Sequence, residues 1–353
     1  MRAQACGVHR AGRCRAHHSG FLASIPASGG GVVNHVVVIG GAGFLGSHLC
    51  RALLERGDRV TAIDPVSAER VVAIRDFGAH PHFAFRCADI TVPGALAGLG
   101  AITHVAHFGH GGGEFGDPIE VIRAASAGAM AAVDLAVAHG ARIVIASGAH
   151  GGTDRRPCFT SRLDAESVRS AAELIAETTA RHYPGARVGI ARPFEVYGPH
   201  SRPGTGVGAT LCAAALRDQT VYLDDEERSF VYVTDVVAAL IALLDREISG
   251  PVDIGGPMVT LSEFARTAIA LAGRGWVECA APRRTGSASR RSRSDDLALR
   301  IASAPSSRRR PDLERTRQLL GWDSTTSLHE GVHRTLDWMR SALQIPPAGS
   351  RVR

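Results

Sequence analysis

The chain has 353 residues, of which 45% are hydrophobic and 21% charged, and its formal net charge is +6. This length and composition exclude a disordered protein and suit one large α/β domain or two domains. All 40 basic residues are arginine, so every mechanism that requires a lysine is excluded.

Residues 1–32 contain no acidic residue and no periodic pattern. We interpret them as a disordered extension, or as a sign that translation begins near Val33. Two alternatives stay open. The spacing of Cys6, His9, Cys14 and His17 loosely resembles a zinc site, and an Arg-rich, acid-poor start can be a targeting segment.

From His35 onward, apolar strands alternate with helical stretches. A short strand, His35–Ile39, precedes a glycine-rich turn and the helical stretch Ser47–Arg56, and the next strand, Arg59–Ile63, ends at Asp64. Further strands are expected over His82–Cys87, His104–Phe108, Arg142–Ser147 and Arg187–Arg192, and helices over Ala68–Phe77, Pro118–His139 and Ala165–His182. This alternation predicts an α/β protein with a doubly wound parallel sheet, the Rossmann arrangement.

The alternation weakens after Arg192, which predicts a second, smaller α/β substrate lobe. We expect a cofactor-binding domain over residues 33–194 and the smaller lobe over 195–345, with the chain near 228–255 returning to the first domain. Residues 282–311 are rich in Arg, Ser, Ala and Pro. Such low complexity predicts an exposed Arg-rich loop.

The glycine-rich turn has the spacing of a dinucleotide site. Gly40, Gly43 and Gly46 would allow a tight turn, close approach of the backbone to a pyrophosphate, and close packing of helix on strand. Asp64 closes the next strand, where its carboxylate can accept hydrogen bonds from the adenosine ribose and would repel a 2′-phosphate. The sequence therefore predicts NAD as the cofactor.

Six segments, in the same order, resemble the NAD-dependent sugar-nucleotide epimerase and dehydratase branch of the extended short-chain dehydrogenase/reductase family. They are Gly40–Gly46, Asp89-Ile90, His107–His110, Arg192–Pro199, Arg228–Asp235 and the closing stretch from Gly321 to Trp338. The resemblance implies a Rossmann fold. It also implies that NAD is held by Gly40, Gly43, Phe44, Leu45, Gly46, Asp64, Asp89, Ile90, Phe108, Gly109, His110, Arg169 and Phe194.

The chain departs from this family where protons are transferred. The family's Tyr-x-x-x-Lys pair falls at Ala165 and Arg169, and a methyl group cannot accept a proton. The family's catalytic Ser or Thr falls at Gly148, with Ser147 beside it. Ser147, His150 and Arg169 are therefore the predicted catalytic residues, His150 because a histidine can titrate near neutral pH.

The resemblance also implies a nucleotide-sugar substrate. Arg228 matches the family's arginine that holds the nucleotide diphosphate. Arg293 is the nearest match in the sequence to a second arginine with that role. Glu195 replaces the asparagine of the family's Arg-Pro-x-Asn segment and would face the substrate. Tyr197 and Tyr232 belong to segments that we expect to be structural.

We predict an NAD-dependent epimerase or dehydratase with an atypical acid/base site. The alternative is a cofactor-binding pseudoenzyme that acts as a partner or sensor. The seven cysteines lack paired spacing, which favours free thiols and a cytoplasmic location. The sequence contains no run of about 18 apolar residues, so we expect no membrane-spanning helix. We expect a monomer or a homodimer, no metal, and neither nucleic acid nor membrane as a partner.

Overall fold

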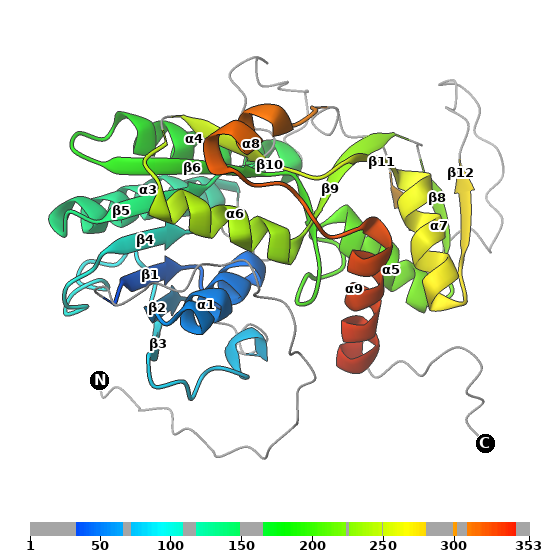
Figure 1. Cartoon of the computed structure of the whole chain (residues 1–353), viewed down its shortest axis with the longest axis horizontal. Coiled ribbons are helices and arrows are strands. Elements are labelled where there is room, and N and C mark those ends of the chain that lie inside the picture. Colours follow the sequence, from blue (N-terminus) through cyan, green and yellow to red (C-terminus); the bar gives the residue numbers. More distant parts are fainter. Residues whose placement is uncertain are drawn as a thin grey trace.

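The computed structural model consists of two lobes that lie side by side along the long axis of the molecule (Figure 1). It describes residues 33–65, 72–108, 118–148, 165–223, 226–248, 250–279, 299–301 and 309–343. Within these residues the larger lobe is built on a seven-stranded sheet, and two three-stranded sheets accompany it.

The strands of the larger lobe run parallel to one another. They are β1 (His35–Ile39), β2 (Arg59–Asp64), β3 (Phe83–Cys87), β4 (His104–His107), β5 (Arg142–Ala146), β6 (Arg187–Pro193) and β10 (Pro251–Ile254). Across the sheet the order is β10-β6-β5-β4-β1-β2-β3, so the strand order reverses between β1 and β4. Sheets of this kind bind ligands at the carboxyl ends of the strands beside the reversal.

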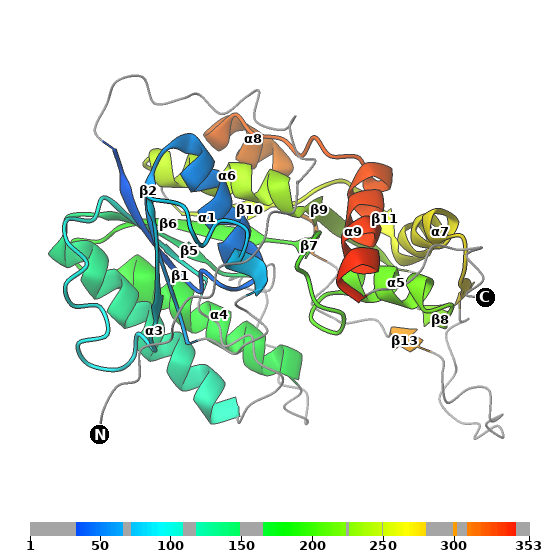
Figure 2. The same ribbon diagram turned by 90° about the horizontal axis from the view of Figure 1, so that it is seen from below.

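Helices cover both faces of this sheet, as Figure 2 shows. They are α3 (Pro118–Ala138) and α4 (Ala165–His182) on one face, and α1 (Phe44–Arg56), α6 (Val233–Asp245) and α8 (Leu313–Leu320) on the other. Every residue of β1 is buried, because a parallel sheet is covered on both sides. The predicted doubly wound parallel sheet is confirmed.

The smaller lobe packs helices against short strands. One of the two remaining sheets joins β7 (Glu195–Tyr197), β9 (Glu227–Tyr232) and β11 (Met258–Thr260), and the other joins β8 (Thr220–Leu223), β12 (Trp276–Cys279) and β13 (Leu299–Ile301). The helices are α5 (Val207–Leu216), α7 (Leu261–Ala272) and α9 (Leu328–Leu343). Their shared core includes Phe264 and Leu336, both fully buried.

The chain passes from the smaller lobe back to the larger one within the segment 228–255. β9, at the start of this segment, pairs with β7 and β11. The return begins at Val233, where α6 starts and packs against α1, and it ends with β10 on the edge of β6.

Only a 3₁₀ turn, η1 (Val72–Ile74), is found in the described part of the helix that was expected over Ala68–Phe77. The ring of Phe77 packs edge-on against Phe83, with the ring centres 5.0 Å apart, and it carries the Arg51 guanidinium 5.3 Å above it. The helix prediction is wrong at its carboxyl end, because these tertiary contacts outweigh local helix propensity.

Part of the expected Arg-rich loop is a strand. Leu299 pairs with Val221 and Ile301 pairs with Leu223, so β13 adds an edge to β8. Backbone pairing with β8 makes a strand of a segment whose composition is typical of a loop. The loop prediction is wrong at these residues, and 280–298 and 302–308 lie outside the described residues, as does the extension 1–32.

Among the described helices, α3 is long and apolar enough to span a membrane, judged by length and composition. Arg123 and Asp134 interrupt its apolar stretch, Val121–Ala138. Ala129 and Val133 are fully buried, and the helix lies against α4 and the main sheet. The small apolar side chains therefore serve packing inside the larger lobe.

Two histidines join the lobes. His48, on α1, donates from Nε2 to the carbonyl oxygen of Pro199 at 2.9 Å, and its ring lies 5.6 Å from that of His200. The ring of His200 in turn lies 5.0 Å from that of Trp338 on α9. Burial lowers the pKa of His48 to about 4, so its side chain is neutral at this junction.

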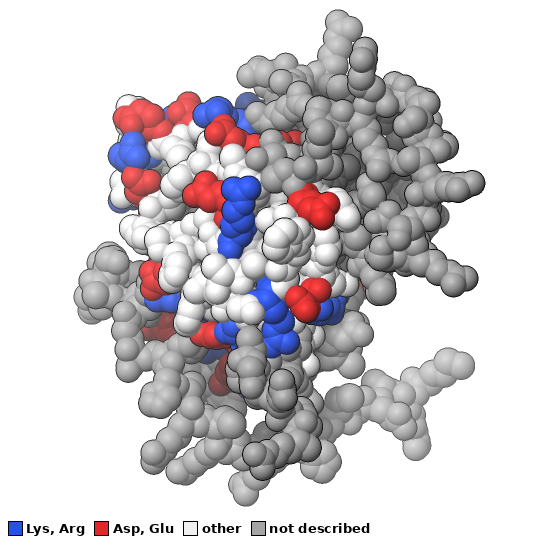
Figure 3. Space-filling view, turned by 90° about the vertical axis from the view of Figure 1, so that its right-hand side faces the viewer, with Lys and Arg blue, Asp and Glu red and all other residues white. Residues whose placement is uncertain are grey.

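Figure 3 views the molecule from the end of the smaller lobe. Described acidic and basic side chains lie interspersed among uncharged ones on this face, and they do not gather into a patch of one sign within the coloured surface.

Candidate active site

The turn between β1 and α1 requires glycine at three positions, Gly40, Gly41 and Gly46. Gly40 has a φ of +78°, in the left-handed region that favours glycine. A Cβ atom at Gly41 would fall 2.6 Å from the Cβ of Ala62, and one at Gly46 would fall 2.1 Å from the carbonyl oxygen of Gly40. The turn is therefore as tight as the glycine spacing predicts.

The amino-terminal end of α1 is open to an anion. Gly43 occupies the cap position and offers no side chain to the first backbone N–H groups, and the first turn contains no acidic residue. A helix N-terminus without a side-chain cap presents the positive end of its dipole and its first N–H groups, which favour phosphate. Phe44, Leu45 and Gly46 supply the backbone of this first turn.

Asp64 lies at the end of β2 and faces the glycine turn. Its side chain is fully buried, and its Oδ2 accepts a hydrogen bond from the backbone N–H of Ala42 at 3.2 Å. The carboxylate is thus held beside the turn, where the adenosine half of a dinucleotide would lie. Its contact with the ribose remains a prediction.

Asp89 and Ile90 follow β3, on the far side of Asp64. Asp89 is exposed, and its Oδ1 accepts hydrogen bonds from the backbone N–H and the hydroxyl of Thr91, at 2.9 and 2.8 Å. Ile90 is half-buried against α3 near Gly128. The loop is held by its own hydrogen bonds, and contact with adenine remains a prediction for both residues.

Phe108 follows β4 and crosses directly over the turn. Its backbone N–H donates to the carbonyl oxygen of Ile39 at 2.9 Å. A Cβ atom added at Gly40 would fall 3.2 Å from the Cβ of Phe108. His107, one residue earlier, is fully buried beside Gly128 of α3. The carboxyl ends of β1 and β4 therefore meet at the strand-order reversal.

These residues fit NAD. The open helix end suits the pyrophosphate, and the buried carboxylate of Asp64 lies one strand away, on the adenosine side. Gly40, Gly43, Phe44, Leu45, Gly46, Asp64 and Phe108 come together at one edge of the sheet. Gly109 and His110 lie outside the described residues.

Ser147 directly follows β5 at the same edge. Its backbone N–H donates to the carbonyl oxygen of Ala191 at 2.8 Å, and its Oγ is buried without a hydrogen-bond partner among the described residues. α4 begins at Ala165, but the side chains of Ala165 and Arg169 are not described. His150 lies outside the described residues. Of the three predicted catalytic residues, Ser147 is therefore the one whose side chain the structure describes.

The sequence analysis did not predict Glu173 as a site residue, although its side chain lies beside Gly148. A Cβ atom at Gly148 would fall 2.0 Å from Oε2 of Glu173, and the Glu173 side chain is buried. Its place in the sequence could have revealed it. It stands four residues after Arg169 and eight after Ala165, which puts all three on one face of a helix.

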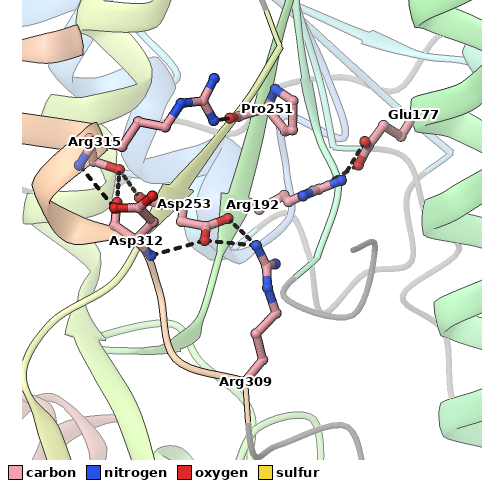
Figure 4. A network of polar contacts seen from close by, with 8 residues as sticks. Glu177, Arg192, Pro251, Asp253, Arg309, Asp312 and Arg315 are labelled. Atoms are coloured by element: carbon pink, nitrogen blue, oxygen red, sulfur yellow. Dashed lines mark hydrogen bonds and ion pairs between the residues drawn. The ribbon is translucent and has the colours of Figure 1, made fainter. Parts of the chain in front are cut away.

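A second buried carboxylate lies one turn further along α4. Glu177 accepts two hydrogen bonds from the Arg192 guanidinium, at 2.6 and 3.0 Å, and both side chains are buried. Figure 4 shows this pair beside a second one, in which Arg309 donates to both oxygens of Asp253. Two ion pairs thus hold β6 and β10 near their carboxyl ends.

Phe194 connects β6 to β7. It is buried, its backbone N–H donates to the carbonyl oxygen of Ile254 at 2.9 Å, and the Arg309 guanidinium lies 5.5 Å above its ring. The ring is thus covered by an arginine, and its contact with the cofactor remains a prediction.

Glu195 and Arg228 form an ion pair next to Phe194. Arg228 donates from Nη1 to Glu195 at 2.9 Å, and from Nε to Glu226 at 2.8 Å. Burial alone would lower the pKa of the Arg228 guanidinium, but these two carboxylates raise it above its ordinary value. The sequence predicted both Glu195 and Arg228 as substrate residues but not that they pair, and Arg293 lies outside the described residues.

Two tyrosines of the matching segments lie in the core of the smaller lobe. Tyr197 and Tyr232 are almost fully buried, with ring centres 5.6 Å apart. Burial raises the pKa of both, that of Tyr232 to about 12. Neither phenol can take up or release a proton readily near neutral pH.

Comparison with known proteins agrees with this geometry. Residues 36–255 match the model of the NAD dependent epimerase/dehydratase family. A UDP-glucuronic acid decarboxylase 1 from Xenopus tropicalis is 28% identical over 325 residues, which cover 88% of this chain and 73% of that protein. UDP-glucuronic acid decarboxylase 2 from Arabidopsis thaliana is 30% identical over 327 residues, covering 84% of this chain and 66% of the other.

Solved structures agree in fold. UDP-glucuronic acid 4-epimerase from Bacillus cereus, in complex with UDP-glucuronic acid and NAD, superposes with a TM-score of 0.68 at 20% identity. The superposition covers 87% of this chain and 99% of that one.

Proposed function

The chain belongs to the NAD-dependent epimerase/dehydratase family, and on this premise we propose that it acts on a nucleotide-activated sugar of the UDP-glucuronic acid type. The observation that carries this proposal is the match to UDP-glucuronic acid decarboxylases over 88% of the chain. The open end of α1 and the buried Asp64 support the use of NAD, which the family requires.

One group of residues binds NAD and another acts on the sugar. NAD, when bound, supplies an acceptor for a hydride from the sugar. The first turn of α1 holds its pyrophosphate, and the predicted role of Arg169 is to hold ribose hydroxyls with its guanidinium fork.

A proton acceptor is needed for the sugar hydroxyl, and the methyl group of Ala165 cannot serve. We propose His150 for this task, since an imidazole titrates near neutral pH. Ser147 would donate or accept a hydrogen bond at the same hydroxyl. Its Oγ, directly after β5, is buried and has no hydrogen-bond partner among the described residues, which supports this role. Glu195, Arg228 and Arg293 are the proposed substrate-binding residues.

We also propose a cytoplasmic location. Cys50 and Cys212 are buried free thiols, and burial raises the pKa of both, that of Cys212 to about 12. Thiols of this kind are inert core residues and are typical of a reducing compartment.

The test is turnover of UDP-glucuronic acid by the purified full chain with NAD, followed by chromatography and mass spectrometry of the sugar nucleotide. We expect either loss of carbon dioxide or conversion to an epimer. His150→Ala should abolish turnover while leaving the affinity for NAD unchanged.

The contrary outcome is NAD binding without turnover of any UDP- or dTDP-sugar. Turnover that appears only after Ala165→Tyr with Arg169→Lys would then identify a cofactor-binding protein that has lost its acid/base pair. Turnover that survives His150→Ala would refute the role of His150.

A further inference from the structure

The Arg228 guanidinium already holds two carboxylates. Nη1 donates to Glu195, and both Nε and Nη2 donate to the same oxygen of Glu226. Because a guanidinium presents its donors in a fixed, planar fork, these contacts occupy the edges with which it would bind a phosphate. Among the described residues the cluster holds one positive and two negative charges, a balance that disfavours an anion.

The members of this cluster differ in exposure. The side chains of Arg228 and Glu226 are 5% and 11% exposed, whereas that of Glu195 is 27% exposed. Glu195 is therefore the most accessible member of the cluster, and the guanidinium itself is almost fully covered.

The strand arrangement places Glu195 at the edge where the cofactor is expected. Glu195 opens β7 directly after Phe194, which follows the carboxyl end of β6. All strands of the main sheet are parallel, so this end of β6 lies at the same edge as the glycine turn after β1. The Glu195–Arg228 pair therefore lies next to the carboxyl end of β6, at the cofactor edge of the sheet.

We propose that Glu195 competes with the substrate's diphosphate for Arg228 and so lowers the affinity of the site for nucleotide diphosphates. The proposal rests on the function proposed above, because it concerns how a nucleotide sugar enters that site. A diphosphate can reach the guanidinium only when the Glu195 carboxylate leaves it, so Glu195 weakens binding of every ligand whose affinity depends on that contact.

The experiment measures the affinity of UDP, the probe, by calorimetry on the full chain with saturating NAD. Glu195→Gln keeps the shape of the side chain and removes its charge. We expect it to tighten UDP binding by about tenfold or more, in line with the energies of charge pairs in partly buried sites. Combining it with Arg228→Gln should abolish the gain.

The matched control is Glu227→Gln, which makes the same change of charge on the neighbouring strand. Glu227 is 49% exposed and pairs with Arg310, away from Arg228. It should change UDP affinity by less than about twofold, because exposed ion pairs contribute little. If Glu195→Gln does not fold, Glu195→Asn, which carries the family's residue, takes its place.

UDP affinity that is unchanged or weaker in the Glu195 variant would overturn the proposal, even if the natural chain turns over UDP-glucuronic acid. Conversely, a tenfold gain in a chain that turns over no nucleotide sugar would uphold the role of Glu195 and refute the proposed function.

Discussion

The carboxylate of Glu173 lies in the space that a side chain at position 148 would need. A Cβ atom at Gly148 would fall 2.0 Å from one carboxylate oxygen and 2.5 Å from the other. The two positions are therefore coupled. A serine or threonine, which the family resemblance would place at 148, cannot coexist with this conformation of Glu173.

Gly148→Ser should destabilise the protein by about 2 kcal/mol or more, because overpacking a buried site forces its neighbours to move. Removing the obstacle should recover much of that loss, so Gly148→Ser with Glu173→Ala should be more stable than Gly148→Ser alone. Chemical denaturation of the three proteins measures both effects.

Gly206→Ser is the control for this pair, because a Cβ atom there would lie 3.8 Å from its nearest neighbour. The residue caps α5 without a side-chain hydrogen bond, so a serine should be neutral or slightly stabilising. Equal losses at positions 148 and 206 would show that Glu173 does not restrict position 148.

NAD should bind at least about tenfold more tightly than NADP, a difference of about 1.4 kcal/mol. The reason is the buried carboxylate of Asp64, which would repel a 2′-phosphate. Asp64→Asn should bring the two affinities close together, as measured by calorimetry. Asp76→Asn removes an exposed carboxylate, 67% accessible, and should leave the ratio unchanged; an unchanged ratio in Asp64→Asn as well would refute the role of Asp64.

Glu177→Ala should cost about 3 to 5 kcal/mol, because it removes the buried carboxylate that accepts two hydrogen bonds from the buried Arg192 guanidinium. Glu247→Ala removes an acid from an exposed pair with Arg187 and should cost less than about 1 kcal/mol. Urea denaturation compares the two, and similar losses would mean that burial of the first pair contributes nothing.

Stability should fall as the pH is lowered from about 6.5 towards 4. Burial lowers the pKa of His48 from 6.5 to about 4, so the unfolded chain takes up a proton in this range and the folded chain does not. The effect should reach about 1 to 3 kcal/mol. The pKa of His200 is lowered in the same direction, mainly by burial, and adds to it.

Melting temperatures measured between pH 4.5 and 7.5 test this dependence. His48→Gln should flatten the curve, whereas His329→Gln, at an exposed position of α9, should not. If the slope is the same in all three proteins, His48 does not cause it.

The strand positions of the larger lobe could be predicted because each strand is a short apolar run that the parallel sheet buries on both faces. The glycine turn was equally readable, since its spacing reports a backbone geometry that no other residue adopts. The helix spacing places Glu173 on the face of Ala165 and Arg169, but the contact of Glu173 with Gly148 and that of Glu226 with Arg228 could not be predicted. Both contacts depend on which side chains the fold brings beside Gly148 and Arg228.

The same distinction explains the two errors in secondary structure. The segment that ends at Phe77 has helical composition, but packing against Phe83 and Arg51 decides its shape. β13 is three residues long and becomes a strand only because β8 offers a free edge. The local sequence of neither segment indicates the residues or the strand that it packs against.

At two of its crossings between the lobes the chain has no linker. Phe194 alone separates β6 from β7, and β9 runs straight into α6. A fragment that stopped at Phe194 would lack β10 and α6, leaving the edge of β6 unpaired and the apolar face of α1 bare, which favours aggregation. The boundary between cofactor-binding and substrate-binding residues at Phe194 is therefore not a boundary between independently folding domains. A substrate lobe cannot be exchanged between relatives as a cassette, because the strand and helix that complete the cofactor lobe would travel with it.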